Sequence, residues 1–259
     1  MHAANAPRFR HAAFAVWARN MLVLRKMAGT SLVINFGEPL LYLLAFGFGL
    51  GMYIGNQMDM PYLTFLASGM LAASAMNTAG FEALYGVFTR MVPQKSYDAM
   101  LASPLEIADI LTGELLYCAT KSVLHGSGIL LVAALLGAVH DWQALWVLPI
   151  LFLVGLTFAA LAMIVTAFAT TYAFFSYYTT LVMMPLMLLS GVFYPIAVLP
   201  PLVQQVLYGL PLVHAVQLMR PLVSGQPMTN TLLHFFVLVV YAVGGYLIAL
   251  RLIRKRLRV

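Results

Sequence analysis

The first candidates for chemistry are the ionisable residues that interrupt long apolar stretches. They are Glu38, Glu82, Glu114, Lys121 and His125. Glu114, Lys121 and His125 are seven and four residues apart, so a helix places them on one face. An ionisable side chain within an apolar span marks a polar pathway by default, because a charge there is costly. For Glu114 and Lys121 a structural ion pair is the commoner interpretation. For Glu38 the sequence favours neither a functional nor a structural role.

Motifs for nucleophilic, metal or phosphate chemistry are absent from the sequence. It contains no G-x-S-x-G, no H-E-x-x-H and no Gly-Lys-Ser/Thr of a phosphate-binding loop, and its histidines are scattered. Cys118, the single cysteine, is expected to be a small buried apolar residue. We therefore expect no catalytic residue, metal site or cofactor site in this chain, and no ATP hydrolysis by it alone.

The composition identifies the class of protein that must position these residues. Of the 259 residues, 63% are apolar and 8% are charged, against about a quarter charged in a soluble domain. A soluble domain, a disordered chain and a nucleic-acid binder are excluded, despite a net charge of +6. The sequence predicts an all-α polytopic membrane protein, with residues 1–259 as a single transmembrane domain.

Six stretches are long enough to cross a membrane, which takes about 20 mainly apolar residues. The predicted spans are residues 31–54, 61–83, 115–137, 144–170, 172–194 and 231–250. The helix of the second span, 61–83, can continue to Met91, before Pro93.

Basic residues set the orientation, because Lys and Arg near span ends mark the cytoplasmic side. Both chain ends are rich in arginine and lysine, so both termini are expected in the cytoplasm, and the number of spans is then even. The apolar residues 196–219 could be counted as a seventh span, which would put the basic tail outside. With six spans, residues 196–230 lie on the outer side.

The outer segment 196–230 contains several prolines but is too apolar for a solvated loop. Irregular backbone at membrane depth persists only where protein buries it or where it lines a wet cavity. We expect short re-entrant or interfacial helices there, with a plain loop as the alternative.

An amphipathic helix is expected at residues 8–27. Phe14, Trp17 and Met21 share an apolar face, and Arg19 and Lys26 lie opposite it. Such a helix lies in the interface and contacts membrane lipids, although a soluble arm packed on a partner would show the same pattern.

The connection at residues 93–111 is the expected cytoplasmic docking region. Residues 96–102 can form a short amphipathic helix, and Ser103, Pro104 and Glu106 have the pattern of a helix start. A short helix facing the cytosol suits a soluble partner; the alternative is an interfacial turn that only links two spans.

Taken together, these features resemble the exporter permeases of the ABC-2 family over about residues 12–255. The carboxyl half carries the resemblance in LSGVFYP (189–195), LPP (199–201), LPLVHAV (210–216) and MRPL (219–222). Two further stretches, EPLLYL (38–43) and YDAMLASP (97–104), are similar to the subgroup of nodulation-factor (lipochitooligosaccharide) exporter permeases.

The resemblance implies a mechanism that the residues alone do not. The permease would form a homodimer in the bacterial inner membrane and bind two copies of a separate ABC ATPase, which hold the ATP and magnesium. Cargo, an amphipathic saccharide or lipid-linked oligosaccharide, would leave the cytoplasmic side. ATPase coupling would fall to Tyr97, Asp98, Met100 and Leu101, and closure of the outer exit to Ser190, Gly191, Phe193, Tyr194 and Pro195.

Other functions remain open from the sequence. An ABC-2 relative could export a drug or another polysaccharide. A secondary transporter driven by an ion gradient would show paired repeats and charges at mid-membrane, both of which are scarce here. An intramembrane enzyme would need a cluster of acid, base or metal ligands, which the sequence lacks.

Overall fold

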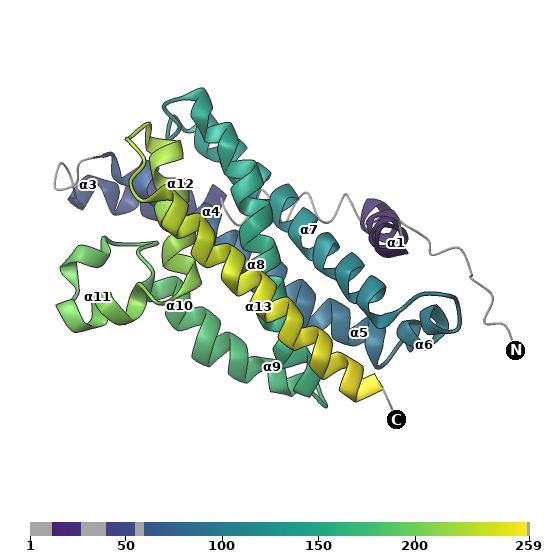
Figure 1. The fold of residues 1–259 in the computed structure, drawn as a ribbon. Helices are drawn as coiled ribbons and strands as arrows, with labels where there is room; N and C mark the ends of the chain where they lie inside the picture. Colours follow the sequence, from purple (N-terminus) through teal and green to yellow (C-terminus); the bar gives the residue numbers. More distant parts are fainter. Residues whose placement is uncertain (1–11, 27–39, 55–59, 258–259) are drawn as a thin grey trace, which may run out of the picture.

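A computed structural model describes residues 12–26, 40–54 and 60–257 of the chain (Figure 1). Every regular element within these residues is a helix, which confirms the predicted all-α fold. Glu38 lies outside the described residues, as do residues 31–39 of the predicted first span and parts of both termini.

The first half of the described chain contains the helix nearest the amino terminus, several short helices and one long, nearly continuous helix. Its elements are α1 (Ala12–Lys26), η1 (Leu43–Phe48), α3 (Gly51–Ile54), α4 (Tyr62–Phe81), η2 (Glu82–Gly86), α5 (Val87–Met91) and α6 (Ser96–Leu101). The backbone stays helical from α4 through η2 to α5, as the sequence predicts, and η2 is a π-helical stretch within it. Such stretches are frequent at functional sites.

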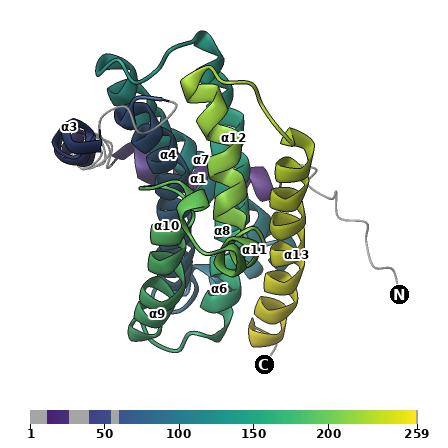
Figure 2. The same ribbon diagram turned by 90° about the vertical axis from the view of Figure 1, so that its left-hand side faces the viewer.

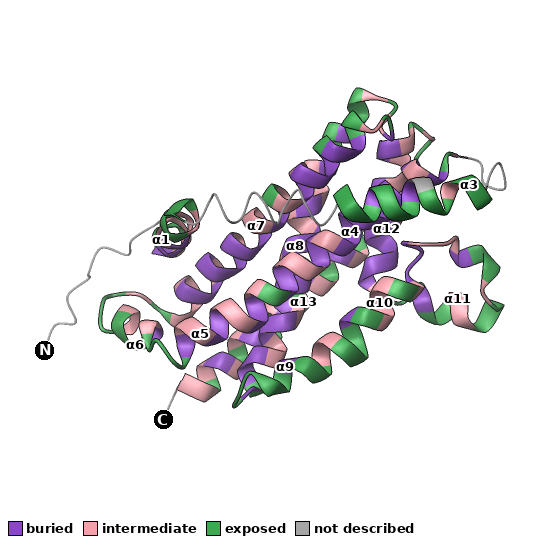
Figure 3. Ribbon diagram, turned by 180° about the vertical axis from the view of Figure 1, so that it is seen from behind, coloured by how far each residue is buried: buried purple, intermediate pink, exposed green. Residues whose placement is uncertain are grey.

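The second half supplies the centre of the bundle. Its elements are α7 (Ile107–Leu135), η3 (Trp142–Trp146), α8 (Val147–Phe168), α9 (Ala173–Tyr178), η4 (Thr179–Met183), α10 (Met184–Leu189), η5 (Ile196–Val198), α11 (Pro201–Leu207), α12 (Pro211–Ser224) and α13 (Thr231–Leu257). Helix α8 packs against α4, α7, α12 and α13 (Figure 2), so the core forms around α8. Exposed residues make up most of α9 and α11 and one face of α13 (Figure 3).

Three of the helices are long and apolar enough to cross a membrane. They are α7, η3 with α8, and α13; a fourth results if α11 and α12, bent by 90°, count as one span. The helices Leu40–Tyr53 and Ala173–Leu189 are apolar but shorter. A count of six spans therefore stays a prediction.

Helix α1 buries a different face from the one that the sequence pattern favours. Ala12, Val16 and Asn20 are buried, whereas Phe14 is 55% exposed. The buried face packs on α7 at Gly113, where an added Cβ would lie 2.5 Å from the carbonyl oxygen of Ala13. The small residues allow the close approach to α7 and leave Phe14 open, as a helix that contacts lipid would, so the position of α1 in the membrane interface stays a prediction.

Within residues 196–230 the chain forms the short 3-10 helix η5 and the helices α11 and α12 rather than a plain loop. Helix α11 is largely exposed, and α12 is mostly buried against α4, α8 and α13. Proline begins α11 and α12, at Pro201 and Pro211, where its missing N–H costs no hydrogen bond. The membrane side on which this segment lies stays a prediction.

Candidate functional site

Helix α6 is the predicted coupling helix, and it is anchored by one buried aromatic side chain. Lys95, just before it, has a φ of 50°, a left-handed turn that reverses the chain after α5. Tyr97 is 1% exposed and lies in the core, and burial raises the pKa of its hydroxyl well above the usual value. The Arg19 guanidinium of α1 donates to the Met100 sulfur at 3.6 Å.

The four residues predicted to contact an ATPase therefore differ in position. Tyr97 points into the bundle, Met100 and Leu101 are half-buried against the core, and Asp98 is exposed. Exposed Ala99 lies beside Asp98. A protein that docks on α6 would meet Asp98 and Ala99, while Tyr97 would position the helix.

The predicted helix start at Ser103 and Pro104 is wrong. Helix α7 begins at Ile107, with Glu106 as its cap, and the Glu106 N–H donates to the Asp109 carboxylate at 3.0 Å. The Ser103 hydroxyl donates instead to the Met100 carbonyl at 2.6 Å, which closes the end of α6. The serine thus ends one helix, and the glutamate–aspartate pair begins the next.

A buried ion cluster lies where α1, α5, η2 and α7 meet. The Arg90 guanidinium binds the Glu114 carboxylate through two bonds, Nε to Oε1 at 2.8 Å and Nη2 to Oε2 at 2.6 Å. Arg90 Nη2 also lies 3.0 Å from Glu82 Oε1, and Lys121 Nζ lies 2.7 Å from Glu82 Oε2. Asn20 of α1 donates to Glu114 at 3.0 Å. Each carboxylate is thereby paired.

Three of the ionisable residues singled out from the sequence therefore meet in this cluster. Glu114 and Lys121 share a face of α7 as predicted, but they pair with Arg90 and Glu82 rather than with each other. Sequence reasoning assigned no role to Arg90 or Asn20 within the bundle. The signal for Arg90 was its position eight residues after Glu82, since that spacing places both on one side of a helix.

A cavity of about 520 Å³ opens beside this cluster. Its lining comes from α1, η2, α5 and α7 and includes Arg19, Tyr85, Thr89 and Lys121. Charged and hydroxyl groups thus face an open space at the end of the bundle that holds α6.

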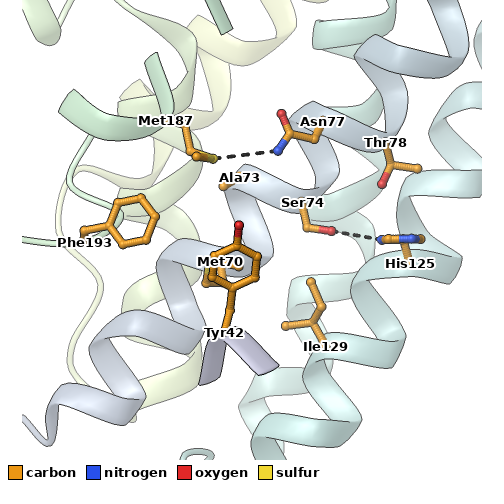
Figure 4. A pocket seen from close by; sticks show the side chains of 10 residues that line it. All are labelled: Tyr42, Met70, Ala73, Ser74, Asn77, Thr78, His125, Ile129, Met187 and Phe193. Atoms are coloured by element: carbon orange, nitrogen blue, oxygen red, sulfur yellow. Dashed lines mark hydrogen bonds between the residues drawn. The ribbon is translucent and has the colours of Figure 1, made fainter. Parts of the chain in front are cut away.

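A second cavity, of about 130 Å³, lies further along α4 and α7 (Figure 4). His125, the fifth predicted residue, is here rather than in the ion cluster, and its Nδ1 hydrogen-bonds with the Ser74 hydroxyl at 3.2 Å. Asn77 Nδ2 donates to the Met187 sulfur at 3.8 Å. Tyr42 and Phe193 supply aromatic rings on the other side of the space.

The predicted outer-exit residues form a tight turn after α10. Gly191 has a φ of 81°, a conformation that glycine adopts without steric cost. The turn lies against α4: a Cβ added at Gly69 would be 2.6 Å from the Val192 carbonyl oxygen. Tyr62 of α4 donates to the Phe193 carbonyl at 3.2 Å. Tyr194 and Pro195 continue the chain from this turn toward η5.

Arg220 of α12 holds the same turn in place. Its Nη2 donates to the Gly191 carbonyl at 2.6 Å, and its Nε donates to the Ser68 hydroxyl at 3.2 Å. The guanidinium carbon lies 3.7 Å from the centre of the Phe65 ring, a cation–π contact. In the sequence Arg220 stands out only as part of MRPL (219–222), and that motif gives no sign of this contact.

Two histidines that are far apart in the sequence pair in the structure. His214 of α12 and His234 of α13 are both buried, and their Nδ1 atoms are 2.7 Å apart. His214 Nε2 lies 2.8 Å from the Tyr208 carbonyl oxygen, so it donates there, and Nδ1 of His214 accepts from His234. No three metal-ligating side chains meet within the described residues.

Comparison with known proteins gives a consistent set of relatives. Residues 11–223 match the family model described as ABC-2 type transporter. Nodulation protein J of Rhizobium leguminosarum bv. viciae is 44% identical over 94% of both chains. Nodulation protein J of Rhizobium meliloti (strain 1021) is 43% identical over 94% of this chain and 93% of its own. The inner membrane transport permease YadH of Escherichia coli (strain K12) is 27% identical over 93% of this chain and 94% of its own.

Proposed function

The chain belongs to the ABC-2 type transporter family, and on this premise we propose that it exports a lipid-linked or modified oligosaccharide across the bacterial inner membrane. Members of this family are the transmembrane permease component and work with an ABC ATPase partner. The chain is thus a permease subunit of a membrane transporter.

The observation that carries the cargo proposal is the similarity over nearly the whole length of the chain to proteins named Nodulation protein J. The sequence motifs resemble nodulation-factor exporters, and the relatives' names agree with that subgroup. A cavity lined by hydroxyl, amide and aromatic side chains inside an apolar bundle supports a cargo with a sugar portion.

The ATPase would act on the permease through α6. In the proposed assembly two copies of the chain form the permease, two ATPase copies dock at the cytoplasmic face, and both chain termini lie on that side. Closure of the ATPase pair would push on Asp98, and Tyr97 would transmit the displacement to the core. The ion cluster supports this route, because it ties α5 and α7, the helices on either side of α6, to each other and to α1. The turn at residues 190–195 would close the outer exit.

The test is to co-express the chain with its ABC ATPase, purify the complex in detergent, and compare Asp98→Lys with Asp141→Lys. Asp141 begins η3, on the predicted outer side, and the same substitution there changes the net charge equally. We expect Asp98→Lys to lower both the amount of ATPase that co-purifies and its hydrolysis rate, and Asp141→Lys to lower neither. A folded wild-type chain that retains no ATPase would contradict the proposal.

A drug or a different polysaccharide is the alternative cargo within the same family. The similarity to YadH, whose name specifies no cargo, leaves this alternative in place. Competition between an acylated chitooligosaccharide and other amphipathic compounds for the purified complex distinguishes the two.

A further inference from the structure

The second cavity has a polar wall that the apolar bundle does not itself require. On α4, Ser74, Asn77 and Thr78 are partly exposed, whereas the alanines between and beside them are buried in the core. Their spacing of three and four residues puts the three side chains on one face. These three polar side chains line the cavity beside Met70 and Ala73 of the same helix, so α4 gives it a polar part and a smaller apolar part.

The two cavities lie one after the other along the helices α4 and α7. Glu82, at the first cavity, follows Thr78 by four residues, and Lys121 precedes His125 by four residues on α7. Four residues are about 6 Å along a helix. A polar surface thus runs from the ion cluster to the second cavity with one helical turn between them.

Some donors and acceptors at the second cavity have a weak hydrogen-bond partner or none among the described residues. The Asn77 amide nitrogen donates only to a methionine sulfur, a weak acceptor. Among the described residues, neither the Asn77 carbonyl oxygen nor the Thr78 hydroxyl has a hydrogen-bond partner. In lipid such groups cost free energy, because hydrocarbon offers no partner. They point to an occupant that brings its own donors and acceptors.

The remaining walls of the second cavity favour a ligand with an uncharged ring that has one apolar side. Tyr42 and Phe193 present aromatic rings opposite Asn77 (Figure 4), and no Asp, Glu, Lys or Arg is among the described residues that line the cavity. A pyranose ring combines an apolar C–H face, which packs on an aromatic ring, with hydroxyl groups at its edge. The size of the cavity, about 130 Å³, suits one ring at a time.

Resting on the proposed function, we infer that the cavity between α4, α7 and α10 binds one uncharged sugar ring of the cargo. Asn77 and Thr78 hydrogen-bond to its hydroxyl or N-acetyl groups, and Phe193 packs on its C–H face. The sugar portion moves along the polar surface of α4 and α7, from the ion cluster to this cavity, while the acyl chain stays in lipid.

The first test measures binding of a chitotetraose that carries one fluorescent acyl chain to the reconstituted permease–ATPase complex. We expect Asn77→Leu and Thr78→Val each to weaken binding roughly tenfold, the loss of about one hydrogen bond to a buried group. Thr179→Val is the matched control, because the Thr179 hydroxyl bonds to carbonyls of its own helix. The same acyl chain without sugars should bind equally to all variants.

The second test does not depend on those variants retaining full stability. Replacing the buried Cys118 by alanine gives a chain without cysteine, into which Asn77→Cys is introduced. We expect a water-soluble maleimide to label that cysteine, and the acylated chitotetraose to slow the labelling at least fivefold. A cysteine placed at Gln143, which is exposed in η3 and does not line this cavity, is the control that the sugar does not protect.

The outcomes separate the two proposals. If the wild type binds the sugar-bearing probe but Asn77→Leu and Thr78→Val bind it as tightly as Thr179→Val, with unprotected labelling at position 77, the site is overturned and the proposed function stands. If the wild-type complex binds and transports no acylated chitooligosaccharide, the proposed cargo is overturned, and the sugar site with it.

Discussion

Loss of Arg90 is expected to destabilise the permease far more than loss of Lys121, although both side chains bind Glu82. Arg90 is the bidentate partner of Glu114, whose side chain has no exposed surface. Arg90→Met leaves that carboxylate with only the Asn20 amide. Removing one partner of a buried pair costs about 3–5 kcal/mol.

Lys121→Met is the matched comparison. The Lys121 side chain is 31% exposed, and Glu82 keeps its contact with Arg90 when Lys121 is removed. An ion pair with this exposure contributes below about 1 kcal/mol. The predicted difference between the two variants is therefore at least about 2 kcal/mol.

The assay is thermal unfolding of the purified chain in one detergent, followed by tryptophan fluorescence. At roughly 2–4 °C per kcal/mol for a chain of this size, Arg90→Met should lower the apparent Tm by on the order of 10 °C, and Lys121→Met by a few degrees at most. The double variant Arg90→Met with Glu114→Met should recover much of the loss, because no buried charge is then unpaired. Equal shifts for Arg90→Met and Lys121→Met would refute this explanation of the cluster.

Three further substitutions test the turn at residues 190–195 and the histidine pair. Arg220→Met removes a charge-assisted hydrogen bond to the Gly191 carbonyl and should destabilise by about 1.5–3 kcal/mol, measured by thermal unfolding; a change within error would show that the turn is held by other contacts. Gly69→Val forces a side chain into the backbone of Val192 and should lower folded yield on size exclusion, whereas Gly244→Val, with nothing within 4 Å of an added Cβ, should not. His214→Phe leaves the Tyr208 carbonyl and His234 without this partner, and should cost about 1–3 kcal/mol, while an unchanged Tm would count against the hydrogen-bonded pair.

The fold class and the helices near residues 62–91, 96–101 and 107–257 were largely predictable. Long apolar stretches with prolines between them are strong signals, and they depend only on local sequence. Helix boundaries were less predictable: Ser103 and Pro104 have a good capping pattern, yet Glu106 and Asp109 cap α7. Several local patterns compete there, and tertiary packing selects among them.

The candidate site was predictable only in part. The ionisable residues of η2 and α7 stood out because they interrupt apolar sequence. Their partners did not: Asn20 is 94 residues from Glu114, and Arg220 is 152 residues from Ser68. Which side chains form hydrogen bonds across such separations depends on how the helices pack. The hydrophobic periodicity of the sequence does not encode that packing. Tyr97 is a further example: an amphipathic helix at residues 96–102 suits contact with a partner or with the bundle, and only the packing shows that Tyr97 is buried in the bundle.

Uptake into inside-out membrane vesicles is the assay for ATP-driven export of an amphipathic saccharide by this chain. Vesicles that contain the chain and its ABC ATPase are mixed with the fluorescent acylated chitotetraose, and probe protected inside is measured over time. We expect uptake that requires ATP and both proteins, and that persists when ionophores remove the ion gradients. Uptake without ATP that an ion gradient drives, or no uptake by a complex that binds its ATPase and hydrolyses ATP, would contradict ATP-driven export.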